Sequence, residues 1–124
     1  SQHEKILTAY LEYMTRVGML LGAKDENATK KHMKNVIEFE TKLAEITIPN
    51  EERRDEESLY NLMTLTQLQE EAPLINWREH FEDAFRLVNR KVSEKEKVVV
   101  YAPKFLKNLT PLIKNYTSTD EGKM

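Results

Sequence analysis

The middle third of the chain most constrains the fold, because it places residues that end helices close to residues that start them. Pro49 has no backbone N–H and disfavours a helical residue before it, so a helix must end near this point. Thr64 and Gln67 have the spacing of a capping box, in which each side chain bonds the backbone N–H of the other residue. Asn76 and Glu79 repeat this pattern. The segment therefore predicts the end of one helix and the beginning of two more.

Apolar residues recur at three- and four-residue spacing along most of the chain, which is the pattern of helices that bury one face. Gly22 follows the first such stretch and is suited to end a helix in the left-handed conformation. Gly18 lies inside that stretch, where it weakens a helix by about 1 kcal/mol relative to alanine, so a closely packed neighbour would explain it. The spacing predicts helices at 4–21, 28–46, 58–63, 65–71, 77–88 and 103–116.

The last two of these helices, and the connection between them, carry more specific predictions. Pro111 lies within the last helix and predicts a kink or a break there. The connection at 89–97 is rich in charge and is expected to be mobile. The helix at 77–88 is expected to bury five apolar side chains, namely Trp77, Phe81, Ala84, Phe85 and Val88.

Residues 97–101, with three consecutive valines, form the one convincing strand in the sequence. A single strand leaves its backbone N–H and C=O groups unpaired, so it needs a partner. Two interpretations stay open: a buried extended connector, or a strand whose partner lies outside this chain. The predicted fold class is mainly α, with several helices and one short strand in a single segment of 124 residues.

Length and composition limit the function classes. A chain of 124 residues is one domain or part of one. With 40% hydrophobic and 32% charged residues, the chain has the composition of a globular protein. A net charge of −2 argues against nucleic acid as a partner. No apolar stretch approaches the length of a membrane span, and the N-terminus begins within a helix, without the pattern of a signal peptide. We therefore expect a piece of a longer polypeptide that does not itself cross a membrane.

The compartment is indicated by two features that point in different directions. The chain has no cysteine, which is typical of a reducing compartment or of a domain that needs no disulfide. Three acceptor sequons for N-glycosylation, at Asn27, Asn108 and Asn115, favour an extracellular or lumenal location. Pro111 follows the second sequon directly, so Asn108 is expected to be the poorest acceptor of the three.

No catalytic constellation is present in the sequence. A zinc site of the His-Glu-x-x-His type needs two histidines one helical turn apart. The three histidines are His3, His32 and His80, and the residues four positions after them are Leu7, Val36 and Ala84. His80 with Asp83 is the only close pair of a histidine and a carboxylate, and it lacks a third ligand. We therefore predict no catalytic residue, no metal ligand and no cofactor in this chain.

Two charged clusters allow a functional and a structural interpretation. The run 53–56, Arg-Arg-Asp-Glu, has the charge to bind an acidic group, but local ion pairs that fix the link between helices are the favoured interpretation. Lys30, Lys31 and Lys34 form either a basic patch or a solvated helix face, and the solvated face is favoured.

Five blocks of the chain, in the same order, resemble the neprilysin and endothelin-converting-enzyme family of zinc metallopeptidases. They are residues 8–14 with 18–22, residues 39–44, residues 53–69, Asn76 with Trp77, and residues 98–103. Some members carry a cysteine just before the first block, where this chain has Leu7. None of the zinc ligands or catalytic residues of that family matches a position in this sequence.

The resemblance implies a role for the segment within a larger enzyme. Members of the family are zinc endopeptidases with a large ectodomain, usually tethered by one membrane helix. The segment resembles the N-terminal, non-catalytic helical region, which covers the active site and limits the size of the peptides that enter. Its implied partners are the catalytic domain of the same polypeptide and the peptide substrates of the parent enzyme, which binds zinc. The alternative is an independent helical protein-interaction module without enzymatic activity.

Overall fold

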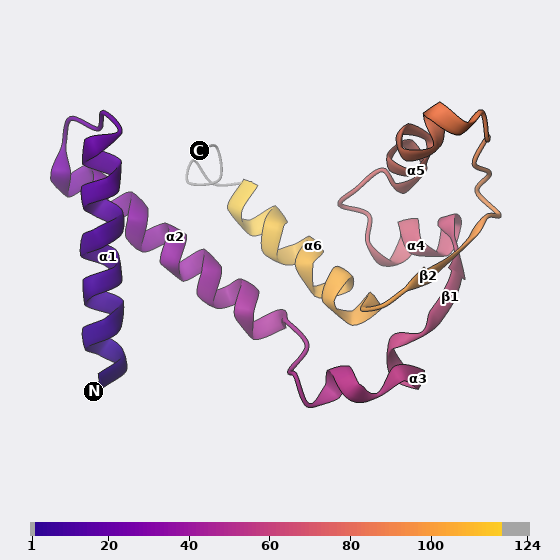
Figure 1. Cartoon of the computed structure of the whole chain (residues 1–124), viewed down its shortest axis with the longest axis horizontal. Helices are drawn as coiled ribbons and strands as arrows, with labels where there is room; N and C mark the ends of the chain where they lie inside the picture. Colours follow the sequence, from indigo (N-terminus) through magenta and orange to yellow (C-terminus); the bar gives the residue numbers. More distant parts are fainter. Residues whose placement is uncertain (1, 118–124) are drawn as a thin grey trace. The chain divides into compact units, whose positions relative to one another are not determined.

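The computed structural model describes residues 2–117 and confirms a mainly helical fold (Figure 1). The chain, expected to be a single segment, divides into two compact units, Ser1–Glu45 and Ile46–Met124. The first unit is a pair of helices, and the second combines helices with a small sheet. The candidate functional surfaces lie in the second unit.

The first unit consists of α1 (Gln2–Leu20) and α2 (Glu26–Ile46), which meet near their connecting loop (Figure 1). Gly22 has a φ of 112° in this loop, which confirms the predicted role of glycine at the end of the first helix. The carboxylate of Asp25 accepts a hydrogen bond from the backbone N–H of Ala28 at 3.1 Å. Because Asp25 satisfies this free donor, α2 begins two residues earlier than the predicted helix at 28–46.

Gly18 on α1 lies against α2, and this close neighbour explains a glycine inside the helix. A Cβ added at Gly18 would come within 2.8 Å of the Cγ2 atom of Thr29. Thr29 is buried, and its hydroxyl donates to the carbonyl oxygen of Asp25 at 2.7 Å. The absence of a side chain at Gly18 therefore allows the two helices to approach closely at this point.

The second unit begins with a short helical turn and ends with the longest helix of the unit. Its elements in chain order are η1 (Glu52–Arg54), α3 (Glu56–Leu59), β1 (Asn61–Thr64), α4 (Leu65–Glu71), α5 (Trp77–Phe85), η2 (Arg86–Val88), β2 (Lys97–Val100) and α6 (Pro103–Thr117). The predicted helix at 58–63 is wrong, because helix α3 ends at Leu59 and the following residues form strand β1.

Strand β1 pairs with β2 in an antiparallel two-stranded ribbon, in which Leu62 lies opposite Val99 and Met63 opposite Val98. The strand predicted at 97–101 is therefore neither an unpaired connector nor a strand whose partner lies outside the chain. Four residues are too few to separate a helical from an extended apolar pattern, so the pairing with β2 decides the conformation of β1.

The core of the second unit forms between helix α4 and one face of the ribbon. Its buried side chains are Leu65, Leu68, Val92 and Val100, and Met63, Trp77, Phe81, Val98 and Leu106 pack around them. Leu65 and Leu68 are three positions apart and project from the same face of α4. Val92 anchors the connection that was expected to be mobile, because its side chain is buried in this core.

The last two helices differ from the predictions in their details. Helix α5 ends at Phe85, and the chain turns at Asn89, which has a φ of 49°. Trp77 and Phe81 pack on the core as expected, but the prediction is wrong for Ala84, Phe85 and Val88, which are exposed because the core lies against the first turns of α5 only. Helix α6 continues through Pro111, which rules out the break that was one of the two predicted outcomes, although proline removes one backbone donor from its ladder.

Candidate functional site

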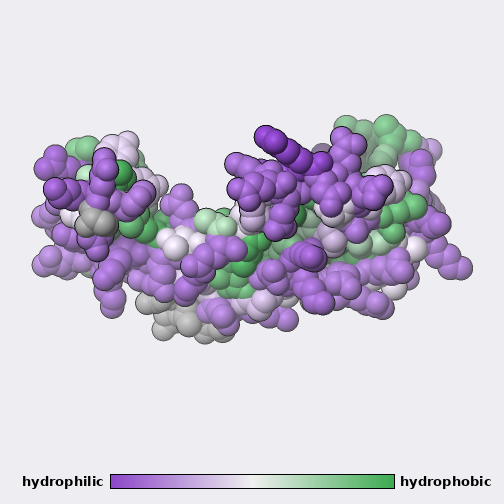
Figure 2. Space-filling view, turned by 90° about the horizontal axis from the view of Figure 1, so that it is seen from below, coloured by the Kyte–Doolittle hydropathy of each residue, from purple (hydrophilic) through white to green (hydrophobic). Residues whose placement is uncertain are grey.

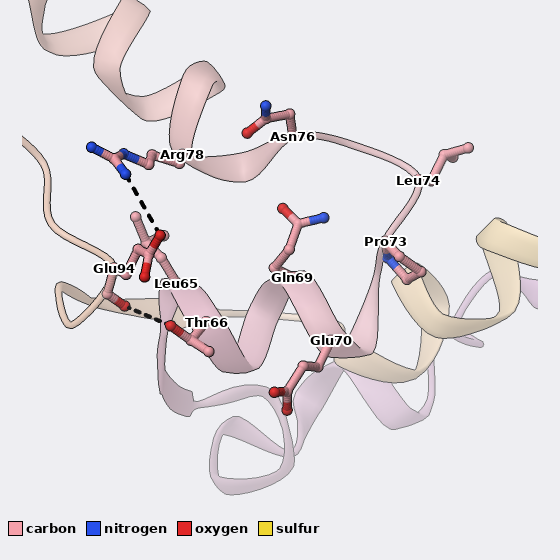
Figure 3. A pocket seen from close by; sticks show the side chains of 9 residues that line it. All are labelled: Leu65, Thr66, Gln69, Glu70, Pro73, Leu74, Asn76, Arg78 and Glu94. Atoms are coloured by element: carbon pink, nitrogen blue, oxygen red, sulfur yellow. Dashed lines mark hydrogen bonds and ion pairs between the residues drawn. The ribbon is translucent and has the colours of Figure 1, made fainter.

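A groove of about 760 Å³ lies between helix α4 and the beginning of α5 in the second unit (Figure 3). Helix α4 forms its floor, the turn at 73–76 closes one end, and the connection before β2 forms the opposite side. The lining residues are Leu65, Thr66, Gln69, Glu70, Pro73, Leu74, Asn76, Arg78 and Glu94.

The predicted helix caps position the walls of this groove. The N–H of Gln67 donates to Oγ1 of Thr64 at 3.2 Å, and the N–H of Thr64 donates to Oε1 of Gln67 at 2.9 Å. These two bonds confirm the capping box at the start of α4. The side chain of Asn76 accepts from the N–H of Glu79 at 3.2 Å and caps α5 as predicted.

Trp77 fixes the turn between α4 and α5 through its indole and its backbone N–H. Its Nε1 atom donates to the carbonyl oxygen of Ala72 at 2.8 Å. Its backbone N–H donates to Oε1 of Gln69 at 3.1 Å, across the groove. Both bonds join the end of α4 to the beginning of α5, so the width of the groove is set by hydrogen bonds within the unit.

Arg78 and Glu94 form the charged wall of the groove, as the close view in Figure 3 shows. The guanidinium of Arg78 lies 2.9 Å from Oε1 of Glu82 and 3.5 Å from Oε1 of Glu94. The hydrogen bond with Glu82 and the charge of that carboxylate raise the pKa of Arg78 above its ordinary value. The backbone carbonyl of Glu94 accepts from the N–H and the hydroxyl of Thr66, at 3.2 and 3.3 Å.

The groove has the chemistry of a binding surface. None of its lining residues is a histidine or a cysteine, and its one hydroxyl, on Thr66, donates to a backbone carbonyl instead of to a general base. Its carboxylate on Glu94 lies 3.5 Å from the guanidinium of Arg78 at an exposed position, which is the setting of a surface ion pair. The arrangement can therefore hold a polar ligand by hydrogen bonds, but it assembles no acid–base pair.

The three histidines lie on three different helices, α1, α2 and α5. The ring of His80 is in edge contact with Phe81, at a centroid distance of 5.3 Å, and with Trp77 at 6.0 Å. The carboxylate of Asp83 lies 3.6 Å from the guanidinium of Arg86. Among residues 2–117, no three histidine, aspartate or glutamate side chains are grouped as a metal ion requires. The described residues therefore do not fit a zinc site.

The charged run at 53–56 makes backbone contacts instead of the local ion pairs that were expected. Nε of Arg53 donates to the carbonyl oxygen of Ile48 at 3.0 Å. The carboxylate of Asp55 accepts from the N–H of Ser58 at 3.3 Å and caps helix α3. These bonds fix the link as the structural interpretation requires, but by a different kind of contact. Lys30, Lys31 and Lys34 are exposed on α2.

The three sequon asparagines are exposed on helices. Asn27 lies in the first turn of α2, and Asn108 and Asn115 lie on α6. The sequon hydroxyl of Thr110 donates to the carbonyl oxygen of Leu106 at 3.4 Å, and that of Thr117 donates to Ile113 at 3.0 Å. Across the part of the chain that the structure describes, no helix combines the length and the apolar character that crossing a bilayer requires.

Sequence reasoning did not find the groove. Its charged wall joins Arg78 to Glu94, which lie on different segments, and only the fold of the connection before β2 brings them together. The capping residues could be found because their spacing is local. A pairing between an exposed arginine and a distant glutamate has no such pattern in the sequence.

Comparisons with known proteins place the segment in context. A family model described as Peptidase family M13 matches residues 1–123. An endothelin-converting enzyme homolog of Locusta migratoria is 54% identical over 121 residues, which are 98% of this chain and 16% of that protein. Neprilysin-3 of Drosophila melanogaster is 52% identical over 122 residues, covering 98% of this chain and 15% of the relative. The chain thus spans about a sixth of the length of these relatives.

A solved structure shows the same fold within a larger protein. The cryo-electron-microscopy structure of the zinc metalloprotease Zmp1 of Mycobacterium tuberculosis, in its open state, matches with a TM-score of 0.69 and 27% sequence identity. The match covers 90% of this chain and 17% of the protease chain.

Proposed function

Because the chain belongs to peptidase family M13, we propose that it is a non-catalytic helical segment that helps to enclose the active site of a neprilysin-like zinc endopeptidase. The parent enzyme processes or degrades peptides, and the segment limits the size of the substrates that reach the zinc. The segment contributes to selectivity through shape, because a wall that excludes folded proteins needs no reactive group of its own.

The observation that carries this proposal is that the family match covers almost all of this chain, whereas the chain covers only a small part of its relatives. The family match includes residues 1–123, yet the aligned part amounts to only 16% of the locust relative. The catalytic residues of the parent then lie in the remaining part of the polypeptide. The scattered histidines and the non-reactive groove of the described residues support the same division of roles.

The proposal also covers the partners of the segment and its cellular location. The partners are the catalytic domain of the same polypeptide and the peptide substrates that it encloses, and the parent holds the zinc ion. The location is extracellular or lumenal, as part of a secreted or single-pass membrane-tethered ectodomain. The three exposed sequon asparagines support this location.

The enclosing role is tested by the size of substrate that the full-length enzyme accepts. A short peptide should be hydrolysed in a chelator-sensitive reaction, whereas the same peptide sequence inserted into an exposed loop of a folded protein should resist. The folded carrier, digested with an unrelated open-cleft protease, controls for access to the loop. Equal rates of hydrolysis of the free and the inserted peptide would contradict an enclosed active site.

The non-catalytic role is tested on the isolated chain. Incubation of the 124-residue chain with zinc and the same peptide should leave the peptide intact. Chelator-sensitive cleavage by this chain would overturn the assignment. A full-length gene product without any zinc peptidase activity would instead favour the alternative, an independent helical interaction module.

A further inference from the structure

The ribbon of β1 and β2 has one face that packs on the core and one face that is open. Met63, Val98 and Val100 belong to the core. Side chains alternate between the two faces of a strand, so the directly paired Leu62 and Val99 point away from the core. They are 52% and 45% exposed.

Tyr60 and Tyr101 are two more large exposed residues at the same end of the ribbon. Each lies one residue beyond the end of its strand, two positions from Leu62 and Val99 respectively. They are 61% and 70% exposed. Tyr60, Leu62, Val99 and Tyr101, which together are called the ribbon face below, thus combine one cross-strand pair, Leu62 with Val99, and two exposed tyrosines that flank it in sequence.

The ribbon face continues into an apolar hollow of about 430 Å³, since Tyr101 also lines that hollow. Ile48, Leu59 and Phe105 are among its other lining residues. Its one charged residue, Arg53, already donates from Nε to the carbonyl oxygen of Ile48. The hollow therefore suits an aliphatic or aromatic side chain and offers little to a charged one.

The open face of the strands is polar at its other end, where Thr64 lies opposite Lys97, so the exposed apolar residues are confined to one end of the ribbon. Antiparallel sheets commonly keep one face apolar and the other polar, and edge strands in contact with water usually carry charges. Figure 2 shows apolar surface open among the hydrophilic residues of the molecule. Large apolar residues exposed together near an apolar hollow are typical of an interaction site.

We infer that the ribbon face and the adjoining hollow are covered by an apolar surface from the remainder of the parent polypeptide, outside residues 1–124. This inference rests on the proposed function. The remainder of the polypeptide is the favoured occupant because it supplies most of the surface in the related proteins. The matched segment makes up only 16% of the locust relative and 17% of the solved protease chain. The competing occupants are a second copy of this chain and the first unit of the same chain.

Burial of the ribbon face is measured in the full-length protein by cysteine labelling. Leu62→Cys should react with a maleimide at least about tenfold more slowly in the native protein than in denaturant, because labelling requires local opening. Ser93→Cys is the matched control, since Ser93 is exposed in the turn before β2 and differs from cysteine by one atom. It should react at similar rates in both conditions, with mass spectrometry assigning each labelled site.

The unmodified protein provides a second measurement that does not depend on how Leu62→Cys folds. Hydroxyl radicals should oxidise Tyr60 and Tyr101 less in the native full-length protein than in the denatured protein, again by at least about tenfold. Native labelling of Leu62→Cys as fast as Ser93→Cys, together with native oxidation of the tyrosines at the denatured rate, would overturn the inference.

The identity of the occupant is tested with p-benzoylphenylalanine in place of Tyr101. Photo-crosslinks to residues of the same polypeptide outside 1–124 support the inference. Crosslinks to the first unit, or to a second copy of the protein, overturn it. The proposed function fails separately, through the loss of zinc peptidase activity in the unmodified protein, whereas labelling and crosslinking report on the ribbon face alone.

Discussion

Gly18 and Thr29 lie so close together that a Cβ on Gly18 would come within 2.8 Å of the Cγ2 atom of Thr29. The methyl group of Thr29 cannot swing away freely, because the residue is buried and its hydroxyl is held by the carbonyl oxygen of Asp25. The contact is the point at which α1 and α2 approach each other.

Gly18→Ala is therefore expected to destabilise the protein, although alanine favours helices. Overpacking typically costs about 1–3 kcal/mol, which opposes a propensity gain of about 1 kcal/mol. Thr29→Ser in the Gly18→Ala background should restore stability, because serine removes the methyl group and keeps the hydroxyl. Urea unfolding followed by circular dichroism measures both. A Gly18→Ala variant more stable than the parent chain would contradict the close approach.

The capping box of α4 should contribute measurably to stability. Thr64→Ala removes the acceptor for the N–H of Gln67 and is expected to lower the free energy of unfolding by about 1 kcal/mol. Thr64→Ser keeps the hydroxyl and should lose less. A double-mutant cycle with Gln67→Ala separates the two bonds. Independent, additive effects of the two alanine variants would show that they do not act as a reciprocal pair.

Leu68 should be far more important for stability than an exposed leucine of the same unit. It is 2% exposed and belongs to the core, so Leu68→Ala should cost about 2–5 kcal/mol. Leu87 is 88% exposed on η2, and Leu87→Ala should change stability by less than about 0.5 kcal/mol. Chemical denaturation of both variants provides the comparison. Similar losses at the two positions would refute the assignment of the core.

The sequons predict carbohydrate on the secreted full-length protein. Asn27→Gln and Asn115→Gln should each remove one glycan. On a denaturing gel, each variant should therefore show a smaller shift on endoglycosidase treatment than the unmodified protein. Asn108→Gln should have the smallest effect, because Pro111 follows that sequon. A protein expressed in a secretory host with the same mobility before and after endoglycosidase treatment would contradict the predicted glycosylation.

The predictions that the structure confirms depend on residues close together in the sequence. Gly22, Thr64 with Gln67, and Asn76 end or begin helices through bonds that span three or four residues. The residue types and the spacing that these bonds require can be read directly from the sequence. The helix at 58–63 was wrong because its apolar residues fit either period, and the pairing of β1 with β2 is formed by residues more than thirty positions apart.

The sequence alone determined the mainly helical class, the helix caps and the resemblance to a peptidase family, because each depends on local chemistry or on the order of short blocks. Only the tertiary structure decided that β1 is a strand, that Arg78 meets Glu94, and that Leu62 and Val99 share one open face. These features follow from contacts between distant segments, whose free energy outweighs the weak preferences of a few residues for one conformation.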